Sequence, residues 1–131
     1  MAKGFEDIVG YCQKMGLEVT RLDGSAQVVI VSAPDRAIHQ MVIDCEGALL
    51  IFEQPIYQIK NAGGPHFKRL LQINRELVHG AFVMDGSGNW ILFRDTLELE
   101  NLDFNEFEGS INALSLGLAE FSSELLALNR G

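Results

Sequence analysis

The sequence predicts an α+β domain in which an antiparallel β-sheet is packed by three α-helices. Three observations support this fold class. Short apolar and β-branched runs alternate with tight-turn sequences, as in an antiparallel meander. Two segments have helical spacing of their apolar residues and end at a glycine. A third segment carries apolar residues at alternating gaps of three and four: Phe104, Phe107, Ile111, Leu114, Leu118, Phe121, Leu125 and Leu128.

The N-terminal half is expected to form one helix followed by a meander. The helix is expected at Phe5–Met15, where apolar residues share one face and Gly16 follows. Cys12 lies on that face and is interpreted as a small buried hydrophobic residue. Turn sequences rich in Asp, Gly and Pro then separate four expected strands. These strands are Leu17–Leu22, Gln27–Ser32, Ile38–Cys45 and Ala48–Glu53.

The middle of the chain predicts a second helix and a hairpin. Gln54–Gly64 is harder to assign, because Pro55 interrupts a strand ladder and several glycines follow. The second helix is expected at Pro65–His79, with proline near its first position. Its Asn74 shares the apolar arc, where a buried polar side chain needs a partner. The hairpin strands are expected at Ala81–Asp85 and Asn89–Arg94.

The closing helix is expected at Phe104–Leu128. Asp103 can cap it, with Glu106 three residues later as in a capping box, and Leu102 can pack against Phe107. The period of its apolar stripe also fits a coiled coil. The positions beside the stripe are small and uncharged, which favours close packing on a sheet instead: Ser110, Ser115, Gly117 and Ser122.

Length, composition and charge restrict the function. A chain of 131 residues with 47% apolar content fits one domain, expected to span residues 1–131. The 18 acidic and 10 basic residues give a formal charge of −8, which disfavours binding to nucleic acid or to an anionic membrane. A partner with basic segments is a better match. No apolar run reaches signal-peptide or membrane-span length, so a cytoplasmic protein is expected.

No motif predicts catalysis, a metal site or a cofactor. His39 and Cys45 lie six residues apart, about 20 Å along a strand, which is too far to bind one ion together. Gly86–Gly88 lacks the lysine of a phosphate-binding loop and is interpreted as a hairpin turn. The acidic residues from Asp95 to Glu108 lack the spacing of a calcium loop. We therefore expect a non-enzymatic protein whose apolar surface binds a partner.

Several short patterns in the second half occur in the order found in a known protein family. They comprise a Leu-Leu-x-x-Asn helix, an Asp/Gly-rich turn, a strand ending in arginine and a leucine-rich connector. The residues are Leu70, Leu71 and Asn74, then Asp85–Gly88, then Leu92, Phe93 and Arg94, then Leu97, Leu99, Leu102 and Asp103. This stretch resembles the Tir-chaperone (CesT-like) family of class I type III secretion chaperones and the related YbjN-like group.

The resemblance implies a type III secretion chaperone-like fold without catalysis or cofactor. It implies a homodimer that holds an extended or partly unfolded segment of a protein partner, such as a secreted effector. One alternative is a YbjN-like regulatory or sensory module that binds a folded partner. Another is a small enzyme or ligand-binding protein that uses a cleft.

Two surfaces are expected to carry these interactions. The dimer interface is expected on the second helix and hairpin, because the apolar arc there is broader than one layer of sheet requires: Leu70, Ile73, Asn74 and Leu77. The partner is expected across the meander, because several strands are apolar on both faces: Val29, Val31, Leu49 and Ile51. The alternative is that helices of the same chain, or of a second copy, cover both faces.

Overall fold

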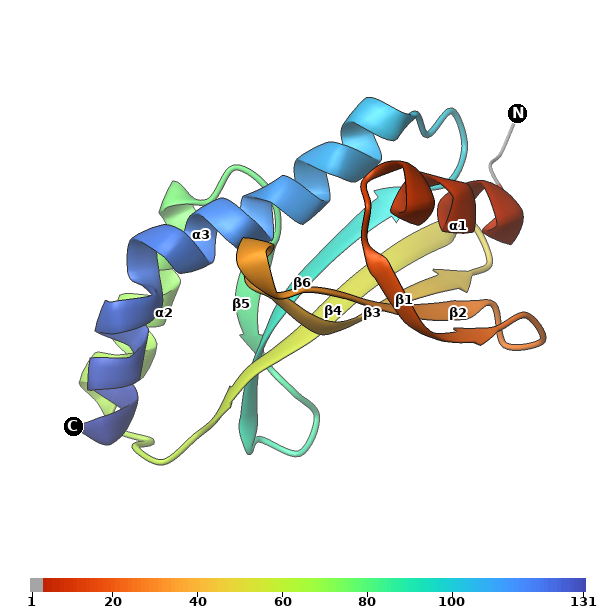
Figure 1. The fold of residues 1–131 in the computed structure, drawn as a ribbon. Coiled ribbons are helices and arrows are strands. Elements are labelled where there is room, and N and C mark those ends of the chain that lie inside the picture. The colour runs from red at the N-terminus through yellow and green to blue at the C-terminus, as the bar shows by residue number, and fades with distance from the viewer. Residues whose placement is uncertain (1–3) are drawn as a thin grey trace.

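The computed structural model describes residues 4–131, which form three α-helices and six strands (Figure 1). A short 3-10 helix, η1 (Pro34–Arg36), joins the second and third strands. The helices are α1 (Phe5–Lys14), α2 (Gly64–Glu76) and α3 (Phe104–Arg130). The strands are β1 (Glu18–Asp23), β2 (Val28–Ala33), β3 (Ile38–Glu46), β4 (Leu49–Gln58), β5 (Ala81–Met84) and β6 (Trp90–Glu98).

All six strands belong to one antiparallel sheet in the order β1-β2-β3-β4-β6-β5. The first four strands form the meander expected from the turn sequences. The β5–β6 hairpin extends it, because β6 pairs with β4 along most of the length of both strands. The expected α+β fold with three helices is therefore confirmed for the described chain.

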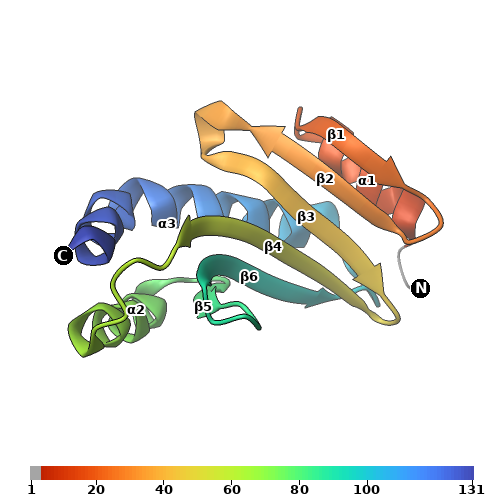
Figure 2. The same ribbon diagram turned by 90° about the horizontal axis from the view of Figure 1, so that it is seen from below.

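The helices lie on one face of this sheet. Figure 2 shows the sheet from its other side, with α1 and α3 behind the strands. The hydrophobic core lies between the sheet and the helices. It joins Ile8 of α1 and Ile73 of α2 to the inward-facing strand residues and to the apolar stripe of α3. No helix of residues 4–131 covers the opposite face.

Helix α3 shows the local signals that the sequence predicts. The Glu106 amide donates a hydrogen bond to Asp103 Oδ1 at 2.8 Å, and Leu102 and Phe107 are both buried. Its stripe packs on the sheet and then beside α2 of the same chain, where Arg69 pairs with Glu124. These contacts agree with sheet packing for the stripe.

Helix α3 is long and apolar. Its 27 residues include a window of mean hydropathy 1.2, so by length and composition α3 resembles a membrane span. Core helices of globular domains pass the same test, and the apolar stripe of α3 is part of the core. The hydropathy of α3 is accounted for by that packing.

Pro55 does not end β4, contrary to expectation. The backbone pairing of β4 with β3 stops at Glu53. Beyond it, the Gln54 side chain accepts from the His39 amide and donates to the Ala37 carbonyl, both at 3.0 Å. Pro55 pairs only with β6, so its missing N–H removes no bond to β3. A register shift follows it, and the strand continues to Gln58.

The second helix ends earlier than expected, at Glu76. Asn74 has the partner that its position requires: its amide donates to the Phe82 carbonyl at 3.0 Å and accepts from the Phe82 N–H at 2.8 Å. Gly80 then turns the chain at φ 72°, and a Cβ at this position would overlap the Phe93 ring. These contacts attach β5 to α2.

Candidate partner-binding surfaces

Alternation along β2 separates residues on the two faces of the sheet. Val29 and Val31 are 0% exposed and lie in the core. The alternate residues, Val28 and Ile30, are half-buried on the other face. The expectation that Val29 and Val31 contact a partner is thus corrected. They are covered by the helix-side core of their own chain, which is one of the two covers that the alternative interpretation proposed.

The residues on the helix-free side form what we call the open face. Leu49 and Ile51, both predicted as partner-binding residues, lie there, 43% and 8% exposed. Ile51 is not part of the main core cluster although it is buried. The open face carries apolar side chains from five strands: Val28, Ile30, Val42, Leu49, Ile51, Pro55, Val83 and Leu92.

One end of the open face is acidic. Leu49 pairs with Glu46 on one side and Glu98 on the other, and Ile51 pairs with Asp44. We call Asp44, Glu46 and Glu98 the acidic cluster. Burial, and secondarily the charge of Glu46, raises the pKa of the Asp44 carboxyl above its usual range. Sequence reasoning placed Asp44 in the third strand, Glu46 in the turn after it and Glu98 in the acidic connector, so it did not bring the three together.

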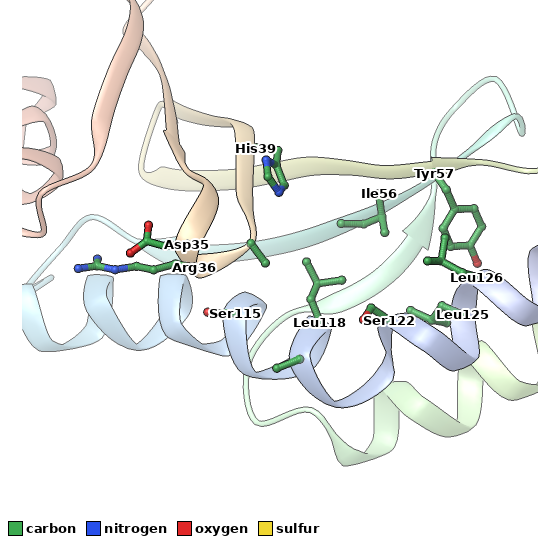
Figure 3. Close-up of a pocket in the computed structure, with 12 residues that line it drawn as sticks. Asp35, Arg36, His39, Ile56, Tyr57, Ser115, Leu118, Ser122, Leu125 and Leu126 are labelled. Atoms are coloured by element: carbon green, nitrogen blue, oxygen red, sulfur yellow. The ribbon is translucent and has the colours of Figure 1, made fainter.

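The structure also has a cleft of about 390 Å³ between the sheet and the C-terminal half of α3 (Figure 3). Small residues of α3 face it, Ser115, Ala119 and Ser122, and their short side chains leave the space between helix and sheet unfilled. At Ser115 and Ser122 the expectation of close packing on the sheet is therefore wrong. Figure 3 shows Ile56 opposite Leu118 across this space. Sequence reasoning missed the cleft because its walls come from three distant segments.

The ionisable groups near the cleft do not converge. Arg36 donates through Nη1 to the Met15 carbonyl at 2.9 Å, and its guanidinium points away from the cleft floor in Figure 3. The Tyr57 hydroxyl is hydrogen-bonded to His66 Nε2, and burial raises the pKa of Tyr57 to about 12. Gln40, at φ 51°, breaks the alternation of β3 and leaves His39 exposed at the rim. The cleft is therefore mainly apolar.

Both cysteines are buried and unbridged. Burial raises the pKa of the Cys12 thiol to about 12 and also raises the pKa of Cys45. A thiolate is the reactive form of cysteine, so burial suppresses reactivity at both positions. The interpretation of Cys12 as a small buried hydrophobic residue is confirmed.

The residues expected at a dimer interface make contacts within their own chain. Leu70 and Ile73 are buried in the core, and Asn74 binds the Phe82 backbone. Leu77 packs against Gly117 of α3, where an added Cβ would lie 3.1 Å from Leu77 Cδ2. This revises the predicted set of interface residues. The exposed apolar side chains in this region are Leu71 (72%), Val78 (87%), Met84 (46%) and Leu116 (71%).

Comparison with known proteins places this fold in a family. The chain belongs to the CesT_Tir_1 family, which it matches over residues 1–131. The resemblance noted in the sequence is thereby confirmed. No curated protein sequence matches the chain.

Solved structures share the fold at low sequence identity. YbjN from E. coli, described as a putative transcription regulator, is 14% identical with a TM-score of 0.70, covering 95% of this chain and 94% of YbjN. The ExoU–SpcU type III secretion complex of Pseudomonas aeruginosa is 16% identical with a TM-score of 0.65, at 92% and 95% coverage. The HopA1–SchA chaperone–effector complex is 9% identical with a TM-score of 0.63, at 88% and 91% coverage.

Proposed function

We propose that this protein is a non-enzymatic, cytoplasmic chaperone-like module that holds an extended segment of a protein partner on its open face. The observation that carries the proposal is the one-sided sheet: all helices lie on one face, and the other face bears apolar side chains from five strands. Membership of the CesT_Tir_1 family supports it, as does the likeness to the HopA1–SchA chaperone–effector complex and to the ExoU–SpcU complex of a type III secretion system.

An extended segment suits this surface better than a compact partner does. The open face offers side chains but no free backbone groups in its central strands, because these are paired on both sides. Free backbone groups occur at the edge strands β1 and β5. A partner segment can add as a strand at one of these edges, where its backbone N–H and C=O groups form hydrogen bonds with the sheet. The rest of the segment can then pack its apolar side chains on the open face. Each apolar side chain fully buried in this way contributes about 1.5–3 kcal/mol.

Site-specific photo-cross-linking in the native host tests the proposal. A photoreactive phenylalanine analogue at Leu49 is expected to capture a partner through one short sequence segment, identified by mass spectrometry. The same analogue at Leu126, an exposed leucine of α3 outside the open face, serves as the control. Equal capture from both positions, or capture at Leu126 only, would rule out the open face as the binding site.

We further propose that two copies associate through the exposed surface around α2. Val78 and Leu116 border one groove together with Glu76 and Ala113, and Leu71 borders a second groove with Met84 of β5. Exposed apolar residues of this size beside grooves are typical of interfaces. The sequence predicted Leu70 and Ile73 as interface residues, but both are buried. The proposed interface uses exposed neighbours of these residues instead.

Light scattering at micromolar concentration tests the dimer. The wild-type protein is expected at about twice the chain mass of 14.5 kDa. Val78→Asp is expected to yield monomer, because a carboxylate would be desolvated at the interface. Leu22→Asp changes an exposed leucine on β1 and is expected to leave the dimer intact. A wild-type mass near that of one chain would exclude the dimer.

A second candidate function is a regulatory module that binds a folded partner. The structural likeness to YbjN, which covers 95% of this chain, supports this second candidate. The two functions differ in the state of the partner. If the cross-linked segment binds equally well as an isolated synthetic peptide, the chaperone-like function is supported. A requirement for the intact folded partner would favour the regulatory module.

A further inference from the structure

The acidic cluster on the open face suggests the chemistry of the segment that binds there. We infer that this segment is basic as well as apolar, with Lys or Arg side chains that pair with Asp44, Glu46 and Glu98 while apolar neighbours cover Leu49 and Ile51. The inference rests on the proposed function and specifies its partner.

The register of the sheet brings the three carboxylates around one exposed leucine. Glu46 and Glu98 face the same side as Leu49, because they are its direct partners on the two neighbouring strands. Neighbouring strands are about 4.8 Å apart, and alternate residues along one strand about 6.8 Å apart. Asp44, two positions before Glu46, is therefore within reach of the same partner segment.

No cationic side chain of the described residues pairs with the cluster. Within residues 4–131, none of the three carboxylates forms an ion pair. Further along the same face, Glu53 pairs with Arg94 at 3.1 Å. Glu53 lies two residues after Ile51 on β4, so a carboxylate of this face can be paired within the chain. The raised pKa of Asp44, caused by burial and then by Glu46, indicates that the charge of Asp44 is poorly compensated.

A basic segment complements both properties of this end of the face. Lys and Arg carry apolar stems below a charged head, so they can cover leucine while reaching a carboxylate. An acidic or neutral segment would leave the carboxylates beside like charge or with reduced hydration. Opposite charges also accelerate encounter with a chain of formal charge −8.

A test must distinguish the effect of the cluster on binding from the effect of the net charge of the chain. The double variant Glu46→Gln/Glu98→Gln removes two charges from the cluster. Glu6→Gln/Glu106→Gln removes two exposed charges from the first turns of α1 and α3, on the helical side of the molecule. Both variants change the formal charge from −8 to −6, because each replaces two glutamates. Thermal melts establish that each variant is folded.

The probes are three fluorescein-labelled synthetic peptides of alternating residues. One alternates apolar residues with Lys, and the other two replace every Lys by Gln or by Glu. Binding is measured by fluorescence anisotropy at low and high salt. The Lys peptide is expected to bind most tightly and to weaken with salt. The cluster variant should weaken binding of the Lys peptide about threefold to thirtyfold, as expected for two exposed ion pairs. The control variant should stay within about twofold, because surface charges away from the site add little.

Several results would overturn the inference. These are equal affinity of the Lys and Gln peptides, equal loss in both double variants, or no binding of the Lys peptide. Leu49→Ser distinguishes these failures from failure of the proposed function. If Leu49→Ser weakens binding of the Gln peptide while both charge variants bind normally, the open face holds apolar segments and only the charge inference is wrong.

Discussion

The two faces of the sheet use the same strands for different purposes. On β2, Val29 faces the helices and is fully buried, while Ile30 faces the open side and is half-buried. On β4, Leu50 is buried in the core and Leu49 is largely exposed. Antiparallel sheets with one solvated face usually place polar residues outward. Here apolar residues from five strands also face outward, among charged ones, and a chain folding alone does not require them.

The charges differ between the two faces as well. The helical side pairs Arg69 with Glu124 between α2 and α3. The open face pairs Glu53 with Arg94 and leaves Asp44, Glu46 and Glu98 without a cation among residues 4–131. The helical side thus pairs charges between its own helices, whereas the open face carries apolar side chains and carboxylates that the proposed partner would complement. The predictions below test this contrast.

The largest effect is expected from a charge placed on either face of β2. Val29→Glu should cost more than about 4 kcal/mol, because it buries a carboxylate without a partner in the core. Ile30→Glu should cost about 1 kcal/mol or less, since its side chain can reach solvent. Urea unfolding monitored by circular dichroism measures both. Similar losses in the two variants would abolish the distinction between the faces.

A matched leucine pair on α3 tests the covered face from the helical side. Leu114 is 0% exposed and Leu116 is 71% exposed. Leu114→Ala is expected to cost about 2–5 kcal/mol, the usual range for a core leucine. Leu116→Ala, measured in the Val78→Asp background so that dimer contacts are removed, should change stability by less than about 0.5 kcal/mol. Thermal melts that do not separate the two variants would contradict the packing of α3 on the sheet.

Alanine substitutions at two glycines with positive φ distinguish the cost of backbone strain from the cost of a packing clash on the covered face. Gly80 and Gly88 have φ values of 72° and 77°. Gly88→Ala should cost about 1–2 kcal/mol, from the left-handed conformation alone. Gly80→Ala should cost about 1–3 kcal/mol more, because its Cβ would overlap the Phe93 ring in the core. Equal losses in denaturant unfolding would mean that Phe93 moves freely.

The smallest effects are expected from pH and have opposite signs on the two sides. The folded-state pKa of Asp44 is raised, so its contribution to stability becomes unfavourable as pH rises above its unfolded value of 3.8. Asp44→Asn should therefore melt at a higher temperature than wild type at pH 7. At a pH below 3.8, where the unfolded-state carboxyl is also protonated, the two should converge.

Glu124 supplies the control with the reverse sign. Its hydrogen bond with Arg69 lowers its pKa below the unfolded value of 4.5. Its stabilising contribution is present above that value and is lost as pH falls through the folded-state pKa. Glu124→Gln should melt at a lower temperature than wild type at pH 7, with the difference vanishing in acid. The same sign of change for Asp44→Asn and Glu124→Gln at pH 7 would show that the Asp44 charge is compensated.

Much of the fold was predictable because its signals are local. The Asp103 cap and the spacing that buries Leu114 depend on residues within a few turns of one helix. Turn sequences separated the strands of the meander for the same reason. The continuation of β4 through Pro55 was missed, because it depends on Gln54 bonding to the backbone of β3 and on the pairing partner offered by β6.

The candidate site was only partly predictable. Leu49 and Ile51 were placed on a partner-facing surface, and the structure puts them on the open face. Val29 and Val31 were grouped with them because the strand is apolar on both sides, a pattern that does not say which side the helices cover. Leu70 and Ile73 were likewise assigned to an interface when they belong to the core.

The sequence alone determined the elements, their capping and the alternation that divides each strand into two sets of residues. Only the tertiary structure decided which set faces the helices, because that choice depends on how α1, α2 and α3 pack together. Strand register was equally beyond the sequence, and it is register that places Glu46 and Glu98 on either side of Leu49. Local patterns act over a few residues, whereas a binding surface is assembled from side chains that are neighbours only after the sheet has formed.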